Sequence, residues 1–308
     1  KFSSKDRLSD VIQQIVSSVN RRVNEASPIV DTRLPDGSRV NVVLAPVALN
    51  GPIVTIRKFG KEAMKMEDLI RFGAIDDKVA EFLKILVKSR YNIFVSGGTG
   101  SGKTTFLNVL SNYIPSDERI ITIEDSAELR IESIRNLVRL EVKQENAEGE
   151  NGISIGDLIK SSLRMRPDRI IIGEVRGGEA FYLLSAMNSG HDGSLSTGHA
   201  NSAADMLKRL MNMILMGIEM PLEAIKSQVA SGIDIIIHLS RLRDKSRKTM
   251  EITEVVGYED GEIKLNPLYV FTEDENSTVE KVSGSLLRTE NPLKNTLKLQ
   301  ISGYKITI

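Results

Sequence analysis

The sequence predicts an α/β fold: a twisted, mostly parallel sheet with helices on both faces, preceded by a small α+β domain. From Asp76 onward, apolar strand-like runs alternate with amphipathic helical segments, which is typical of such sheets. Before Gly60, the strand-like runs are short and hairpin-like. The 308 residues suffice for about two domains with a real core. We therefore expect an α+β domain over 1–60, a linker over 61–75 and the α/β domain over 76–308.

The composition excludes several classes of protein. Lys plus Arg (41) balances Asp plus Glu (41), so net charge does not support bulk nucleic-acid binding. The absence of cysteine excludes a disulfide scaffold and cysteine-ligated zinc, and it suits a reducing compartment. No run of 18 apolar residues is present, so we expect a soluble, cytoplasmic, globular chain. Because the sequence starts without Met, we also expect residues upstream of it.

The first sixty residues predict one helix and three strands. Residues 8–23 place apolar side chains on one helical face. Residues 28–33 and 39–44 form strands joined by a turn at 34–38, and residues 52–58 form a third strand. In the linker, residues 67–72 predict a short helix.

The remaining chain predicts the alternating domain. The expected strands after the first one are 119–125, 137–142, 168–175, 194–199 and 234–239, and the expected helices are 76–89, 104–113, 153–165, 178–189 and 202–216. Residues 143–152 are polar and contain glycine, which indicates a mobile loop. Beyond residue 250 the chain is strand-like, with turn signals at Asp260-Gly261 and Asn266-Pro267, and it carries no motif that we can assign.

The stretch YNIFVSGGTGSGKTT, residues 91–105, carries the strongest functional signal. Gly97, Gly102, Lys103 and Thr104 fit the pattern G-x-x-x-x-G-K-[ST], between an apolar strand and a helix. Glycines let the backbone turn its N–H groups toward a phosphate, and the helix dipole favours the anion. Lys103 would reach the β- and γ-phosphates, and the Thr104 hydroxyl would bind Mg²⁺. The alternative is a strand–turn–helix junction that binds no ligand. The order of strand, loop and helix favours binding of a nucleoside triphosphate instead.

The expected phosphate-binding residues of this stretch are Gly98, Thr99, Gly100, Ser101, Gly102, Lys103, Thr104 and Thr105.

Acidic residues follow two of the predicted strands. Glu174 ends the apolar run that starts at Asp168, and Glu124 and Asp125 end the run 120–125, with Glu128 shortly after. Ligands in such sheets bind beyond the carboxyl ends of the strands, so these carboxylates are placed to hold Mg²⁺ or orient water. For Asp125, helix capping or pairing with a nearby arginine is an equally weighted alternative.

Two of the three histidines lie close together in the sequence. His191 and His199 flank the segment Gly193–Gly198, which is rich in Gly, Ser and Thr. We interpret this pair as functional, whereas His238 lies within an apolar strand and is interpreted as structural.

Five ordered blocks give the sequence a family resemblance. They are GGTGSGKTT (97–105), ITIEDSAEL (121–129), NLVRLE (136–141), SLRMRPDRIIIGEVRGGEA (162–180) and GHDGSLSTGHANSA (190–203). With residues 31–59, the likeness covers roughly 8–240. The sequence resembles the motor ATPases of type II and type IV secretion systems, and most of all the branch of type IV secretion and tight-adherence pilus assembly.

The resemblance implies a RecA-like P-loop core, linked flexibly to an N-terminal domain in a ring-shaped homohexamer. It implies ATP and Mg²⁺, and peripheral association with the cytoplasmic membrane face through an inner-membrane platform protein. The Walker A loop falls on 97–105, the "Asp box" on Glu124, Asp125 and Glu128, the Walker B end on Glu174, and the "His box" on His191 and His199. Glu128 occupies the place of the proposed catalytic base, whereas Glu174 and Asp125 would serve the Mg²⁺ shell.

The resemblance also implies phosphate contacts from the N-terminal domain. The arginines that match are Arg57 and Arg39, with Arg33 less surely. A planar guanidinium on a moving domain could sense the γ-phosphate, although surface salt bridges are the alternative.

Two other functions compete with a secretion motor. A RecA-like nucleic-acid motor, such as a helicase or packaging ATPase, shares the phosphate loop, but the chain has no Trp and no aromatic–basic strip. The basic stretch 241–248 is more typical of a solvated turn. A small-molecule kinase is the third hypothesis, and the whole domain before the phosphate loop argues against it. No nucleic-acid partner is expected.

Overall fold

The computed structural model describes residues 4–19, 21–58, 63–143 and 151–305. The chain divides into two compact units, Lys1–Ala63 and Met64–Ile308. Part of the segment expected as a linker belongs to the larger unit. Helix α2 (Met66–Arg71) buries Met66 and Leu69 in its core. Residues 144–150, in the expected mobile loop, lie outside the described residues.

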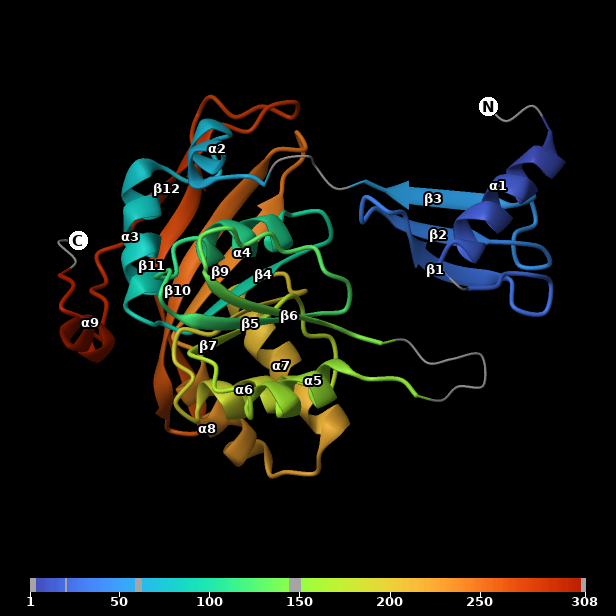
Figure 1. Ribbon diagram of the computed structural model, residues 1–308. Helices are drawn as coiled ribbons and strands as arrows, with labels where there is room; N and C mark the ends of the chain where they lie inside the picture. Colours follow the sequence, from blue (N-terminus) through green and yellow to red (C-terminus); the bar gives the residue numbers. More distant parts are fainter. Residues whose placement is uncertain (1–3, 20, 59–62, 144–150, 306–308) are drawn as a thin grey trace. The chain divides into compact units, whose positions relative to one another are not determined.

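The smaller unit packs one helix on a three-stranded antiparallel sheet (Figure 1). Its elements in chain order are α1 (Lys5–Ser17), β1 (Ile29–Arg33), β2 (Arg39–Val43) and β3 (Ile53–Arg57). Ile12 and Val16 of α1 are buried with Val30, Val40 and Val42 of the sheet. This apolar contact positions the helix on one face of the sheet.

The helix expected over 8–23 begins earlier, at Lys5, and ends at Ser17. The hydroxyls of Ser17 and Ser18 donate to the carbonyls of Gln14 and Ile15, an alternative to helix continuation that serine favours. Val23 is nevertheless buried in the same core. The apolar periodicity predicted the burial of Ile12, Val16 and Val23 correctly, but Val19 is exposed and the helix is shorter than expected.

The larger unit is built on one sheet with the strand order β12-β11-β10-β9-β4-β8-β7-β5-β6. The strands are β4 (Ile93–Gly97), β5 (Arg119–Glu124), β6 (Asn136–Glu141), β7 (Arg169–Ile172), β8 (Leu195–Gly198), β9 (Ile235–Arg241), β10 (Arg247–Glu259), β11 (Glu262–Glu273) and β12 (Gly284–Arg288). From β6 to β9 all neighbours are parallel. From β9 to β12 they are antiparallel, so the C-terminal strands extend a parallel core at one edge.

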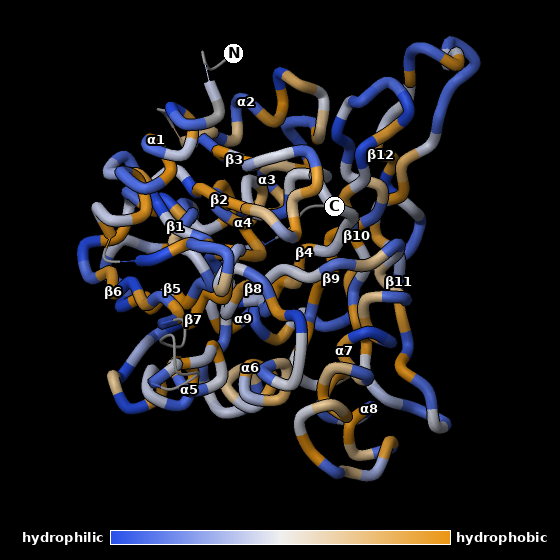
Figure 2. Tube along the Cα trace, turned by 90° about the vertical axis from the view of Figure 1, so that its right-hand side faces the viewer, coloured by the Kyte–Doolittle hydropathy of each residue, from blue (hydrophilic) through white to orange (hydrophobic). Residues whose placement is uncertain are grey.

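Helices cover both faces of this sheet (Figure 1). One face carries α2, α3 (Asp77–Lys88), α4 (Lys103–Ser111) and α9 (Leu297–Ser302), and the other carries α5 (Ile155–Ser162), α6 (Ala180–Met187), α7 (Ala203–Gly217) and α8 (Leu222–Gly232). In β4, Ile93 and Val95 face the first layer and Phe94 the second. Figure 2 shows the apolar residues that run along the strands between the layers. The predicted fold class is confirmed.

Two details of the C-terminal half differ from expectation. The sequence analysis placed no helix over α8, where Ile225 and Val229 are buried one turn apart. The turn signal at Asn266-Pro267 was wrong: both residues lie inside β11, beside a register shift in its pairing with β10. Proline is tolerated at such irregular positions because one ladder hydrogen bond is already lost there. The signal at Asp260-Gly261 was correct, since it joins β10 to β11.

Among the described helices, none combines the length and the apolar character needed to cross a bilayer.

Candidate nucleotide site

The loop after β4 has the shape that a phosphate cradle requires. A Cβ on Gly97 would lie 2.4 Å from the carbonyl oxygen of Leu239, so only glycine fits there. Gly100 and Gly102 have φ of 73° and 100°, conformations that glycine adopts without strain. Gly102 caps α4, and Lys103 is its first residue. The backbone of residues 98–100 is exposed, which leaves it open to a ligand.

Lys103 is the buried cation of this loop, with 8% of its surface exposed. Its Nζ donates to the carbonyl oxygen of Gly98 at 3.0 Å and lies 3.3 Å from Nδ1 of His199. Burial lowers the pKa of Lys103, and the charge of Glu174 opposes that shift. The lysine is thus a desolvated cation beside an exposed loop.

Glu174 and His199 meet because they follow neighbouring parallel strands, β7 and β8. His199 Nε2 lies 2.9 Å from Glu174 Oε1, and Arg176 donates to the other carboxylate oxygen through Nε (2.9 Å) and Nη2 (2.7 Å). Burial first, and then the charge of Lys103, lower the pKa of His199. Nδ1 of a neutral imidazole can accept from Lys103, while Nε2 stays in close contact with the Glu174 carboxylate. Lys103, His199 and Glu174 therefore form one continuous polar chain.

Glu124 organises the turn that carries the other predicted acids. Its Oε2 accepts from the backbone N–H groups of Glu128 (2.7 Å) and Leu129 (2.9 Å), and its burial raises the pKa of its carboxyl. Asp125 is exposed, and Glu128 is half-buried. The pKa of Arg176 is raised mainly by its hydrogen bond to Glu174, with a further contribution from the charge of Asp125. Asp125 thus lies on the Glu174 side of the turn, and its two alternatives remain open.

The two histidines of the predicted pair are not brought together. His199 follows the C-terminal end of β8, whereas His191 precedes its N-terminal end, so the strand separates them across the sheet. His191 Nδ1 lies 3.3 Å from the carbonyl oxygen of Ala186. His191 is therefore not part of this cluster, which corrects its placement with His199. His238 is buried in β9, with Nδ1 2.9 Å from Ser96 Oγ.

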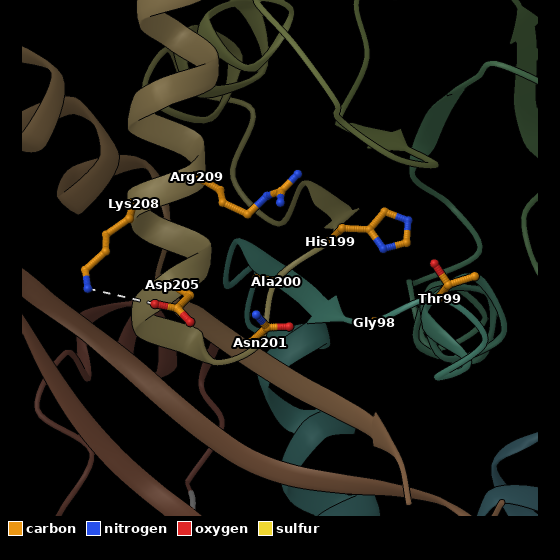
Figure 3. A pocket seen from close by; sticks show the side chains of 8 residues that line it. All are labelled: Gly98, Thr99, His199, Ala200, Asn201, Asp205, Lys208 and Arg209. Atoms are coloured by element: carbon orange, nitrogen blue, oxygen red, sulfur yellow. Dashed lines mark ion pairs between the residues drawn. The ribbon is translucent and has the colours of Figure 1, made fainter.

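A pocket of about 400 Å³ opens beside the loop (Figure 3). It is lined by Gly98, Thr99, His199, Ala200, Asn201, Asp205, Lys208 and Arg209. Arg209 extends from α7 on the His199 side, and its charge also lowers the pKa of that histidine (Figure 3). Lys208 lies 3.8 Å from Asp205 in an ion pair. The sequence analysis missed Asn201 and Arg209. Asn201 lies just before α7, within the block 190–203, and Arg209 lies one turn after Asp205 on α7, a spacing that the sequence does show.

The N-terminal arginines form a row on the smaller unit. Arg33 pairs with Arg39 across β1 and β2, and Arg39 pairs with Arg57 across β2 and β3. Residues directly opposite share one face of a sheet, so three cationic side chains are neighbours there. They lie in the smaller unit, whereas the phosphate loop lies in the larger one.

The residues of the loop fit a nucleotide with Mg²⁺. Ser101 Oγ is buried and has no hydrogen-bond partner within the part of the chain that is described. Thr104, the second residue of α4, is half-buried next to Lys103. The described residues contain no cluster of three His, Cys, Asp or Glu that could hold a metal. Mg²⁺ in phosphate sites relies on one or two protein oxygens, phosphates and waters, and Thr104 and Glu174 carry oxygens of that kind.

Comparisons with known proteins show the family of the chain. A family model described as "Type II/IV secretion system protein" matches residues 1–286. An uncharacterised protein of Methanocaldococcus jannaschii is 46% identical over 197 residues, which are 62% of this chain and 27% of that protein. The type IV secretion system protein PtlH of Bordetella pertussis is 34% identical over 270 residues, covering 79% of this chain and 78% of PtlH.

A solved structure shares the fold. The VirB11 ATPase of the Brucella suis type IV secretion system, crystallised with sulphate, aligns with a TM-score of 0.51 and 29% identity, covering 81% of this chain and 83% of that one. The larger unit therefore has the RecA-like fold of these ATPases, preceded by a small N-terminal domain. With a family model that covers most of its length, the chain belongs to the type II/IV secretion system protein family.

Proposed function

We propose that this chain hydrolyses ATP to ADP and phosphate and thereby drives a secretion or pilus-assembly machine. The observation that carries the proposal is the chain of contacts from Lys103 through His199 to Glu174, beside an exposed glycine loop. It joins a phosphate-binding cation to a carboxylate at the carboxyl edge of a parallel sheet, where nucleotides bind.

Each residue has a role that its position supports. The loop amides and the N-terminus of α4 bind the phosphates, and Lys103 moves from the Gly98 carbonyl to the β- and γ-phosphates. Thr104, Glu174 and Asp125 would hold Mg²⁺, which would neutralise charge on the phosphate oxygens. Glu128 accepts the proton of the attacking water. His199 contacts both Glu174 and Lys103, so it would respond when Lys103 moves to the phosphates.

The oligomeric state, location and partner of the chain are proposed from its family membership. We propose a homohexamer at the cytoplasmic face of the membrane, docked on an inner-membrane platform protein, of the type IV secretion or tight-adherence branch. Arg39 and Arg57 would contact the phosphates of the bound nucleotide. Their alignment in one row supports a shared anionic ligand.

A nucleic-acid motor is less well supported. The basic stretch 241–248 forms the exposed turn between β9 and β10, as expected, and Arg243, Arg247 and Lys248 all donate to acceptors within the chain. ATPase stimulation by single-stranded DNA at physiological salt would reverse this preference.

The test is phosphate release by three variants. Lys103→Ala should lose both ATP binding and turnover. Glu128→Gln and Glu174→Gln should bind ATP but hydrolyse it about 100-fold more slowly, the scale of a lost general base or metal ligand. Lys84→Ala, on the surface of α3, is the control and should match wild type. Full turnover in Lys103→Ala would reject the proposal.

A further inference from the structure

The hairpin that joins β9 to β10, residues 241–248, packs against the outside of the phosphate loop. Arg247 Nε donates to the carbonyl oxygen of Gly100 at 2.8 Å. A Cβ on Gly102 would lie 3.4 Å from Arg247 Cδ, and one on Gly100 would lie 4.0 Å from Arg241 Nη1. Two arginines therefore lie against the two glycines that let the loop turn.

The bond from Arg247 fixes one peptide group. In a planar trans peptide, the carbonyl of Gly100 and the N–H of Ser101 point to opposite sides. With the carbonyl bound outside the loop, the Ser101 N–H points back across it, to the carbonyl oxygen of Gly98 at 3.3 Å. That hydrogen bond is long, so a phosphate oxygen on the same side can replace the Gly98 acceptor at small cost while the peptide keeps its orientation. Because Gly100 has no Cβ, little else in its own structure prevents the peptide from rotating.

The hairpin is anchored on its far side. Arg243 makes two hydrogen bonds to the carboxylate of Glu273, at 2.8 and 2.6 Å. Asp244 accepts from the backbone N–H of Val282 at 2.9 Å. Glu273 ends β11 and Val282 precedes β12, so the hairpin joins the C-terminal strands to the phosphate loop.

We propose that Arg247 is a positioning residue that preorganises the phosphate loop, and that the anchored hairpin makes ATP affinity depend on the β11–β12 connection. The proposal rests on the ATP-binding function proposed above. It gives a role to the C-terminal segment, for which the sequence offered none. Movement of residues 274–283 would shift Arg247 and release the Gly100 carbonyl.

The experiment compares Arg247→Ala, Arg247→Lys and Glu273→Gln with Lys245→Asn. Lys245 is exposed on the same hairpin with φ of 66°, which asparagine tolerates, so this control removes an equal charge without touching the loop. We would measure Kd for a fluorescent ATP analogue, KM and kcat for ATP, and hydrogen exchange of residues 98–104 without nucleotide.

Arg247→Ala should weaken ATP binding and raise KM about five- to ten-fold, with a smaller fall in kcat, and should speed exchange in the loop. Lysine should restore part of the affinity, because it can donate to the same carbonyl. Glu273→Gln should shift KM in the same direction by a smaller factor, and Lys245→Asn should stay within about two-fold of wild type.

The outcomes separate the two proposals. Unchanged loop exchange in Arg247→Ala would overturn the positioning role, whether or not ATP binds. Equal losses in Arg247→Ala and Lys245→Asn would also overturn it, since only charge would then matter. Wild-type protein that binds no ATP would instead reject the proposed function.

Discussion

His199 occupies a position where its own charge state matters. Its Nδ1 faces Lys103 and its Nε2 faces Glu174, so a second proton would put two cations 3.3 Å apart. Burial, and then Lys103, lower the pKa of His199 from 6.5. The imidazole is therefore neutral at neutral pH. Since the unfolded chain binds this proton more readily, His199 makes stability fall as pH drops below about 6.5.

The first prediction at the scale of residues follows from the neutral charge state of His199. Turnover of ATP should fall as pH is lowered below the ordinary histidine pKa of 6.5, because an imidazolium would repel Lys103. His199→Gln should be less active at pH 7 but should lose this acidic limb. The measurement is kcat/KM between about pH 5 and pH 8. An acidic limb of unchanged shape in His199→Gln would show that another group controls it.

At this scale, the sequence could predict site residues that lie close together in the chain, but not those that are distant in sequence. Lys103 and its glycines were recognisable because one short stretch contains the whole loop. Arg247 could not be recognised, because its partner Gly100 lies 147 residues away. His191 was grouped with His199 because the two are close in sequence. Strand β8 lies between them, so they are found at opposite ends of that strand.

At the scale of elements, the start of α6 is held against the end of α7 by two glycines. A Cβ on Gly178 would lie 2.7 Å from the Cα of Gly217, a backbone atom that cannot rotate away. This close approach positions α6 after the turn that carries Glu174. Residues 177–180 (GGEA) belong to one of the five blocks found in the sequence, but the sequence does not show that Gly178 packs against Gly217.

Gly178→Ala should therefore destabilise the larger unit by about 1–3 kcal/mol, the scale of overpacking. Gly177→Ala is the matched control, because its Cβ would meet only the end of the Glu179 side chain, at 3.2 Å. Urea unfolding of both variants measures the difference. Equal midpoints would mean that α6 can shift without cost.

Elements were predicted well where apolar periodicity and tertiary burial coincide, as in β4, β5 and β9. They were mispredicted where a local signal competed with tertiary structure. Ser17 and Ser18 ended α1 early, and Pro267 was accommodated inside β11 rather than in a turn.

At the scale of the molecule, the class of the sheet could be predicted, but not the strand order. Pairing of β4 with β9 joins segments that no local pattern connects. The antiparallel strands β10–β12 read as strands in the sequence, yet nothing local says that they extend the same sheet.

The proposed ring makes a prediction at this scale. Light scattering with ATP should show a species about six times the 34.1 kDa chain, and specific activity should rise with protein concentration as that species forms. Arg57→Ala should lower turnover while leaving the mass unchanged. A monomer with full turnover at all concentrations would reject the ring.

The central place of β4 also has a consequence for how the chain folds. Asn92, just before this strand, bonds to a residue 101 positions later, and Ser96 within it contacts one 142 positions later. Closing such large loops costs entropy before any contact compensates for it, which slows folding. The phosphate loop can therefore assemble only after β8 and β9 have been synthesised and have paired with β4. A nucleotide would then bind only to chains in which β4 has already paired with β8 and β9.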